Sequence, residues 1–216
     1  ETLVAFGRSE FALEAGRLLI DRFGPFQWQI ATTATDANGF ALRVARAITG
    51  RPKVLVFNGC YHGTVDDTFV SLENGKTVTS PGLLGQVNDL TQTAVACEFN
   101  DLAGVEAALA KGDVAAILAE PVMTNSCMVL PEAGFHDGLR QLSLKYGALL
   151  IMDETHTISS GLGGYTRVHS LRPDIFVVGK CVAGGLPTAV WGLTDETAKR
   201  YEEADAKREP GRTGMG

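Results

Sequence analysis

Short, continuous apolar runs recur along the chain, and they restrict its possible folds more than any other feature. Val54–Phe57 (VLVF), Ala115–Ala119 (AAILA), Ala148–Met152 (ALLIM) and Ile175–Val178 (IFVV) contain no alternating polar residues. Such runs are typical of strands that are covered on both faces, as in a parallel sheet between two helix layers. We therefore expect an α/β fold with a mostly parallel, seven-stranded sheet and helices on both faces.

The remaining elements follow from the same patterns. Strands are predicted at Trp28–Ala31, Lys53–Asn58, Ala94–Cys97, Ala115–Ala119, Ala148–Met152, Ile175–Val178 and Ala189–Gly192. Helical periodicity predicts helices at Glu10–Phe23, Ala37–Ile48, Leu102–Ala110, His136–Tyr146 and Asp195–Ala204. Asn100 or Asp101 is the expected N-cap of the third helix, and Gly147 the expected C-cap of the fourth. The polar stretch Ser71–Gln92 is predicted to be a long loop near the edge of the sheet.

Composition and charge narrow the class of protein. The 216 residues carry a net charge of -6 and no basic stripe, which argues against nucleic acid as the main partner. The four cysteines form no C-x-x-C pair, no apolar stretch reaches about 18 residues, and no signal peptide is visible, so a cytoplasmic protein is expected. Because the chain starts at Glu1 and stops in the loop-like EPGRTGMG, we expect an internal piece of a longer polypeptide.

Polar residues of unusual type follow several of the predicted strands. They are Asn58–Gly63, Glu120, Asp153–Thr157 and Lys180. In open α/β sheets, ligands bind at the carboxyl ends of the strands, so this convergence indicates a functional site.

The sequence lacks the motifs that three common kinds of functional site require. Leu149–Glu154 (LLIMDE) looks like a nucleotide-binding Walker B strand, but both Gly-Lys pairs, Gly75–Lys76 and Gly179–Lys180, lack the first glycine of a P-loop. The G-x-S-x-G motif of serine hydrolases is absent. No metal site is expected, because the histidines show no ligand spacing; they are His62, His136, His156 and His169.

Lys180 and Asp153 indicate a different chemistry. Lys180 follows an apolar strand and precedes flexible glycines, so it is predicted to be a desolvated, nucleophilic amine that forms a Schiff base rather than a surface lysine. An aldehyde cofactor bound in this way is pyridoxal 5′-phosphate (PLP), whose pyridine nitrogen needs an acidic partner. Asp153 ends the neighbouring strand and is the predicted partner, although a helix cap or a salt bridge is its simpler interpretation.

Several motifs in this order resemble the class III aminotransferases of the fold-type I PLP superfamily. They are Gly59–Gly63 (GCYHG), Ala119–Val122 (AEPV), Met152–Gly161 (MDETHTISSG) and the lysine segment Pro173–Gly192. The resemblance implies that Tyr61 stacks on the cofactor ring, that His62 and Glu120 lie against the cofactor, and that the whole chain, 1–216, is the PLP-binding large domain. It also implies that the family's N-terminal segment and C-terminal small domain are absent here.

The stretch Thr33–Asn38 (TATDAN) resembles the family's phosphate-binding turn. The N–H groups of Ala34 and Thr35, with the Thr35 hydroxyl, would take the phosphate, since helix N-termini bind anions. An ordinary Thr/Asp helix cap is compatible with this reading.

Other positions depart from the family pattern. Ala34 replaces a Gly, and Thr155 replaces a Val that packs on the ring. His156 stands where relatives carry Gln or Met, and it could bond the cofactor or simply pack. Arg167 is a poor candidate for binding a substrate carboxylate, because its surroundings are predicted to be a loop.

The resemblance implies a PLP-dependent aminotransferase that moves an amino group from an amino acid or amine to a keto acid or aldehyde, with Lys180 and Asp153 as catalytic residues. The alternatives are an intramolecular aminomutase of the glutamate-1-semialdehyde type and a non-catalytic PLP-binding module. Small-molecule amino donors and acceptors are the expected partners, with neither nucleic acid nor membrane, and a homodimer with the site at its interface is expected.

Overall fold

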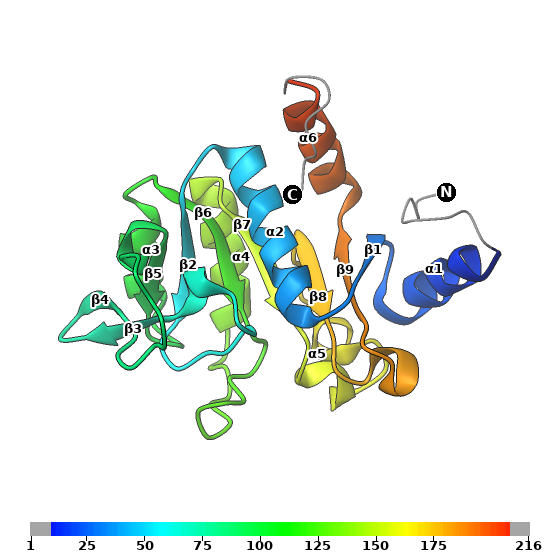
Figure 1. Cartoon of the computed structure of the whole chain (residues 1–216), viewed down its shortest axis with the longest axis horizontal. Helices are drawn as coiled ribbons and strands as arrows, with labels where there is room; N and C mark the ends of the chain where they lie inside the picture. Colours follow the sequence, from blue (N-terminus) through cyan, green and yellow to red (C-terminus); the bar gives the residue numbers. More distant parts are fainter. Residues whose placement is uncertain (1–9, 208–216) are drawn as a thin grey trace.

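The computed structural model describes residues 10–207, so the predicted C-terminal loop EPGRTGMG lies outside the described residues. A seven-stranded sheet forms the centre of the molecule (Figure 1), in the order β1-β9-β8-β7-β6-β2-β5. Its strands are β1 (Gln27–Ala31), β2 (Lys53–Phe57), β5 (Ala94–Cys97), β6 (Val114–Ala119), β7 (Leu149–Asp153), β8 (Ile175–Val178) and β9 (Ala189–Leu193). All seven strands occur where the sequence predicts them.

Within this sheet, β9 is the strand that runs against its neighbours. It pairs antiparallel with both β1 and β8, whereas β5, β2, β6, β7 and β8 pair parallel. The predicted mostly parallel α/β architecture is therefore confirmed. Because β2 pairs with both β5 and β6, the strand order reverses direction beside β2. Open sheets of this kind bind ligands outside the carboxyl ends of the strands near such a reversal.

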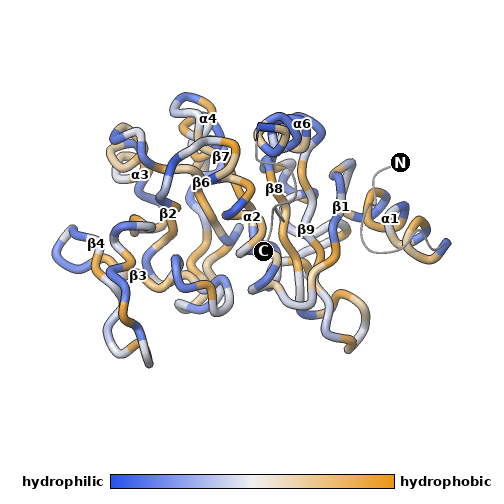
Figure 2. The backbone as a smooth tube through the Cα atoms, turned by 45° about the horizontal axis from the view of Figure 1, so that its top comes forward, coloured by the Kyte–Doolittle hydropathy of each residue, from blue (hydrophilic) through white to orange (hydrophobic). Residues whose placement is uncertain are grey.

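Helices cover both faces of the sheet, as the unbroken apolar strands require. On one face lies α2 (Ala34–Thr49), whose buried residues pack on alternate strand residues such as Val56, Leu118 and Ile151. On the other lie α3 (Leu102–Leu109) and α4 (Phe135–Tyr146), which pack on the intervening residues such as Leu55 and Leu150. Figure 2 shows the hydrophobic colour concentrated in the central strands between these helices.

Two helices lie at the periphery. α6 (Asp195–Asp205) continues from β9 and packs against α2. α1 (Glu10–Phe23) stands beyond β1 at one side of the molecule in Figures 1 and 2. It is anchored mainly at its last turn, where the Phe23 ring lies 5.8 Å from Trp28 and 5.4 Å from Phe176, measured between centroids. Most of α1 is therefore exposed, including apolar side chains.

The helix caps predicted for α3 and α4 are present in the structure. Asp101, rather than Asn100, is the N-cap of α3, because its Oδ1 accepts the N–H of Gly104 at 2.9 Å. Gly147 ends α4 in the left-handed conformation, as predicted. Helix α2 begins three residues before its predicted start, because Thr33 and Asp36 form a capping box: Thr33 Oγ1 accepts the Asp36 N–H, and Asp36 accepts the Thr33 N–H.

Two predicted loops contain regular structure. The stretch Ser71–Gln92 includes most of a hairpin, β3 (Val70–Glu73) and β4 (Lys76–Thr79), which packs beside the edge strand β5. The segment around Arg167 forms a short helix, α5 (Gly164–Val168), instead of a loop. Both corrections concern elements of only four or five residues, which carry little hydrophobic periodicity.

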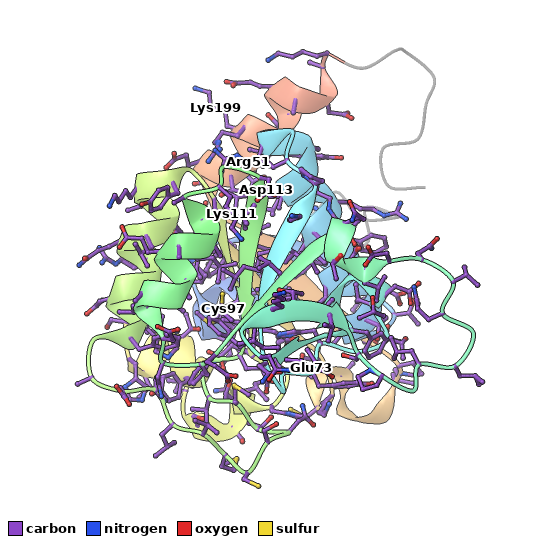
Figure 3. The ribbon with its side chains drawn as sticks, turned by 90° about the vertical axis from the view of Figure 1, so that its left-hand side faces the viewer. Arg51, Glu73, Cys97, Lys111, Asp113 and Lys199 are labelled. Atoms are coloured by element: carbon purple, nitrogen blue, oxygen red, sulfur yellow. The ribbon has the colours of Figure 1, made fainter. Side chains whose placement is uncertain are left out.

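Charged residues gather at the end of the sheet where the central strands begin. In Figure 3, Arg51, Lys111, Asp113 and Lys199 lie at the upper end, where β2 and β6 begin. Arg51 serves the fold there: its Nη1 donates to the carbonyl oxygens of Val114 at 3.0 Å and Tyr146 at 2.8 Å. Within residues 10–207, no helix has the length and apolar character needed to cross a membrane.

Candidate active site

A cavity of about 220 Å³ opens at the carboxyl ends of the parallel strands, beside the first turn of α2. Its lining residues come from the first turn of α2, the end of β7 and the segments after β2, β6, β7 and β8; they are Ala34, Thr35, Tyr61, His62, Gly63, Glu120, Asp153, Thr155, His156 and Lys180. All eight residues that the sequence nominated for this site therefore line one cavity. Their roles toward a ligand remain predictions.

Asp153 is the centre of a buried hydrogen-bond network at the floor of the cavity. Its Oδ2 accepts Nδ2–H of Asn38 at 2.8 Å and faces Nδ1 of His62 at 2.9 Å. Its Oδ1 accepts the N–H of Thr155 at 3.0 Å. Asn38 also donates to the carbonyl of His62 at 3.1 Å, so α2 and the loop after β2 are joined through this carboxylate.

The network holds Asp153 as a carboxylate. Burial raises the pKa of Asp153, but its hydrogen bonds and the charge of His62 lower it more, and the net pKa lies below the ordinary value. For His62, burial lowers the pKa, but the Cys60 side chain and the Asp153 carboxylate raise it more strongly, so its pKa lies well above the ordinary value. Nδ1 of His62 is therefore a hydrogen-bond donor to a fixed negative charge.

Lys180 lines the cavity from the segment after β8. The residue is exposed, so the prediction of a desolvated amine is wrong for the chain as the structure describes it. Its φ of 55° is unusual for a side chain with a Cβ, and conformations of this kind are often found at functional sites. The preceding residue, Gly179, packs directly on α2: a Cβ there would lie 2.9 Å from the Cβ of Ala34. A glycine is thus required for the close approach of the lysine segment to the first turn of the helix.

The first turn of α2 provides backbone donors on another side of the cavity. Ala34 and Thr35 follow the Thr33 N-cap, so their N–H groups have no partner within the helix. Thr35 Oγ1 accepts the N–H of Thr64 at 3.1 Å, and a Cβ on Gly63 would lie 2.1 Å from that same oxygen. The loop after β2 is consequently fitted closely around the helix N-terminus, which is suited to an anion.

Glu120 also lines the cavity. It is 4% exposed, and its Oε1 accepts the N–H of Tyr61 at 3.2 Å. Its Oε2 accepts the N–H and the hydroxyl of Thr124, at 3.2 and 2.7 Å. The Thr124 hydroxyl also contacts Nδ1 of His156. The Tyr61 side chain remains 44% exposed and lines the cavity.

Glu154, adjacent to Asp153, belongs to the fold rather than to the cavity lining. It is fully buried and accepts the Thr157 hydroxyl at 2.6 Å and the N–H groups of Tyr165 and Thr166 at the start of α5. Arg167 in that helix donates to the carbonyl of Arg22 at 2.8 Å and does not line the cavity. The sequence prediction that Arg167 is a poor carboxylate ligand is consistent with this contact, although its stated reason, a loop, is wrong.

Two residues of this network were not predicted from the sequence. Asn38 is a fully buried amide on the apolar face of α2, and a polar residue at such a position is a usable sequence signal. Thr124 lies in the loop after β6, and no sequence pattern marks it as a site residue.

In residues 10–207 no group of three or more His, Cys, Asp or Glu side chains is placed to hold a metal ion.

The cavity matches the chemical requirements of PLP. A primary amine and a buried carboxylate line it together, and a helix N-terminus with free N–H groups borders it. In addition, three buried side-chain atoms at this site have no hydrogen-bond partner within the described residues: Asn38 Oδ1, His62 Nε2 and Thr155 Oγ1. Unpaired buried polar atoms are costly, and a bound polar group would satisfy them.

Comparison with known proteins decides the family. Residues 4–216 match the model of the family described as Aminotransferase class-III. The chain belongs to this family. Its members are PLP-dependent enzymes, and the solved relatives include a transaminase with PLP bound, 26% identical.

The more similar relatives are aminomutases. A glutamate-1-semialdehyde aminomutase from Pseudomonas aeruginosa PAO1 is 48% identical, with a TM-score of 0.90, covering 98% of this chain and 47% of that one. A variant of the same enzyme was solved in complex with PMP. Glutamate-1-semialdehyde 2,1-aminomutase from Desulforudis audaxviator is 37% identical over 189 residues, which are 85% of this chain and 44% of the relative. An omega-transaminase from Sphaerobacter thermophilus is 32% identical, with a TM-score of 0.82, covering 90% of this chain and 47% of its own. The chain spans about half the length of these relatives.

Proposed function

We propose that the chain is the PLP-binding large domain of an enzyme of the glutamate-1-semialdehyde 2,1-aminomutase type. The observation that carries this proposal is the cavity in which Lys180 and Asp153 meet the N-terminus of α2. Relatives with the aminomutase name, at 37 and 48% identity, favour intramolecular transfer over the intermolecular transfer that the sequence motifs first suggested. The substrate would be glutamate 1-semialdehyde, and the product its isomer with the amino group on carbon 1.

The residues of the cavity have distinct roles in this proposal. Bound PLP would supply an electron sink for the carbanion formed at the substrate carbon. Lys180 Nζ would hold the aldehyde and, once displaced by the substrate amine, would accept and return the proton of the carbon that bears the amino group. The Asp153 carboxylate would keep the proton on the pyridine nitrogen. Both residues line the same cavity, which is the condition that these roles require.

The other lining residues would position the cofactor. The N–H groups of Ala34 and Thr35 would bind the phosphate, assisted by the Thr35 hydroxyl, whose proton is free because its oxygen accepts from Thr64. Tyr61 would stack on the ring, since its backbone is fixed by Glu120 while its side chain stays open to the cavity. His62 would act through Asp153, which it holds ionised.

The second candidate is intermolecular amino transfer, and the observation that favours it is the 32% identity to an omega-transaminase. The two reactions share the same chemical groups. They differ in whether the amino group leaves with the substrate that delivered it. The decisive experiment therefore supplies the full-length protein with PLP and glutamate 1-semialdehyde, with and without an added keto acid, and identifies the product. Isomerisation without acceptor is expected, and a strict requirement for acceptor would show that the proposal is wrong.

The Lys180→Ala variant tests the site itself. The wild-type protein is expected to show a visible absorption band with PLP that borohydride reduces to a stable adduct, and the variant to lack that adduct. Turnover should fall by roughly 10²- to 10⁴-fold from the lost proton transfer alone. Lys145→Ala is the matched control, because Lys145 on α4 is exposed, pairs with Glu106 of α3 and does not line the cavity. An unchanged adduct in Lys180→Ala would show that the assignment of Lys180 is wrong. A wild-type protein that binds PLP but does not turn over glutamate 1-semialdehyde with or without a keto acid would favour the non-catalytic module.

We also propose a homodimer in the cytoplasm. The dimer is supported by an exposed apolar face on α1 and the adjoining strand, which includes Phe11, Leu18 and Ile30. The compartment is supported by the four cysteines, all within the described residues and all free thiols. Small-molecule amino substrates follow from the family.

A further inference from the structure

Three polar side chains form a continuous chain on one wall of the cavity. Glu120 follows β6, Thr124 lies in the next loop, and His156 follows β7. Glu120 Oε2 bonds the Thr124 hydroxyl at 2.7 Å, and that hydroxyl contacts Nδ1 of His156. Nδ1 of His156 lies 3.9 Å from the Glu120 carboxylate. The family resemblance assigned a role to neither Thr124 nor this chain of contacts.

The number of protons available determines the direction of each bond. Glu120 accepts from the Tyr61 N–H, the Thr124 N–H and the Thr124 hydroxyl, so its carboxylate acts only as an acceptor. The hydroxyl of Thr124 has one proton, and it donates that proton in its hydrogen bond to Glu120. Its oxygen can then only accept from the imidazole, and Nδ1 of His156 must carry a proton.

The proton on Nδ1 also determines the state of Nε2, the other ring nitrogen of His156. In a neutral imidazole with a proton on Nδ1, Nε2 bears a lone pair. Within residues 10–207 no hydrogen bond occupies Nε2 of His156, and the residue lines the cavity. We propose that Glu120 and Thr124 lock His156 in the Nδ1–H tautomer, so that Nε2 is a second proton acceptor in the cavity, besides Lys180.

The role in turnover rests on the proposed function, because two positions of the substrate must gain or lose a proton when an amino group changes carbon. The tautomer does not rest on it. A second proton on His156 would convert Nε2 from acceptor to donor and place a positive charge beside Glu120. The other titratable groups that line the cavity are Tyr61, His62, Asp153 and Lys180. Protonation of His156 should therefore alter the electrostatic environment of anything bound there.

Nitrogen NMR of histidine-labelled protein measures the tautomer directly. The His156 signals are assigned by their loss in His156→Gln, first without cofactor. We expect Nδ1 in the protonated position and Nε2 in the unprotonated position at a pH where the ring is neutral. Thr124→Val keeps the shape but removes the hydroxyl, so the two tautomers should become mixed. Thr124→Ser keeps the hydroxyl and should restore the wild-type pattern.

The same variants with bound PLP test the orientation of Nε2. The Nε2 signal of wild-type His156 should shift when PLP binds, and the shift should be smaller in Thr124→Val. The proposal is overturned if wild-type His156 carries its proton on Nε2, if Thr124→Val leaves the tautomer unchanged, or if PLP leaves the Nε2 signal of wild-type His156 unmoved. A protein that shows the expected tautomer yet fails to isomerise glutamate 1-semialdehyde would refute the proposed function and leave the tautomer lock standing.

Discussion

At the scale of single residues, neighbours in the sequence serve separate purposes. Asp153 and Glu154 are adjacent carboxylates at the end of β7, but successive side chains of a strand point to opposite sides. Asp153 lines the cavity and accepts from Asn38, whereas Glu154 accepts from the start of α5. The carboxylate pair therefore does not act as a unit, and neither an acid–base dyad nor a metal site is formed by it.

The buried pair His62–Asp153 should make stability depend on pH. The folded-state pKa of His62 is raised, so its contribution is complete below its unfolded pKa of about 6.5 and is lost as pH rises through the folded pKa. The folded-state pKa of Asp153 is lowered, so its contribution is present above about 3.9 and is lost as pH falls through the folded pKa. The pair should stabilise the fold most between about pH 4 and 6.5.

His62→Gln tests this dependence through the free energy of urea unfolding of the cofactor-free protein. We expect the destabilisation to be largest near pH 5–6 and to shrink as pH rises, by about 1.4 kcal/mol for each tenfold change in proton affinity that the fold imposes on the histidine. His169→Gln is the control, because His169 is exposed. A destabilisation that stays constant from pH 5 to 9 would contradict the assignment of a charged pair.

The residues that reasoning from sequence could name were those attached to recognisable strand ends. Lys180, Asp153 and Glu120 each directly follow an apolar run, and the carboxyl ends of parallel strands must meet. Asn38 was visible only as an amide on a buried helix face, and Thr124 not at all, because its importance arises from contacts between loops distant in sequence. Such contacts depend on tertiary geometry, which a local pattern does not contain.

At the scale of elements, the close contact between β8 and α2 positions the site. Gly179 allows the lysine segment to lie against Ala34, and Ala34 and Thr35 of the same helical turn line the cavity. The spacing between amine and anion site is thus set by two small residues. The resemblance of Thr33–Asn38 to the family's turn places Ala34 at a Gly position, which implies that this chain already fills part of the available space.

Gly179→Ala should therefore disturb stability and cofactor binding together. The new Cβ would lie 2.9 Å from the Ala34 Cβ, closer than van der Waals contact, and overpacking of this kind costs about 1–3 kcal/mol. We expect a lower free energy of unfolding and at least about tenfold weaker PLP binding, measured by urea titration and by fluorescence. Adding Ala34→Gly should recover most of both losses, since it removes the opposing methyl group.

The control lies in the same helix. A Cβ on Gly39 would meet nothing within 4 Å, so Gly39→Ala should leave PLP binding unchanged and stabilise α2 by roughly 0.5–1 kcal/mol. If the double variant Ala34→Gly, Gly179→Ala binds PLP as weakly as Gly179→Ala alone, the contact between these two residues does not set the site.

The elements that were missed share a physical cause. β3 and β4 are partly exposed strands of four residues, without the buried apolar run that revealed the main sheet. Their turn, Asn74–Gly75, has φ values of 49° and 73°. An Asn-Gly dipeptide is a strong hairpin signal, but the loop prediction was based on the polar composition of the stretch and did not use it. α5 has five residues and begins where Glu154 accepts its N–H groups, so a tertiary contact rather than local propensity forms it.

At the scale of the whole molecule, an apolar face beside the site is not covered by any of residues 10–207. α1 and β1 expose Phe11, Leu18 and Ile30 at 87, 58 and 48%. A groove of about 880 Å³ runs between α1 and the segment Cys181–Ala183, directly after Lys180. Exposed apolar patches of this kind mark interaction surfaces. A second copy of the chain seated there would contact the segment that directly follows Lys180.

Leu18→Glu tests this interface, because it places a charge in the groove while changing no residue of the cavity. We expect the full-length wild-type protein to sediment as a dimer and the variant to shift toward monomer by at least about tenfold in dissociation constant, since burying an unpaired charge is costly. PLP should also bind more weakly to the variant, because Cys181–Ala183 would lose its support. Leu144→Glu is the matched control: Leu144 is 65% exposed on α4 and does not line the groove, so the dimer should persist. A wild-type monomer, or a dimer that Leu18→Glu leaves intact, would mean that another part of the polypeptide covers this face.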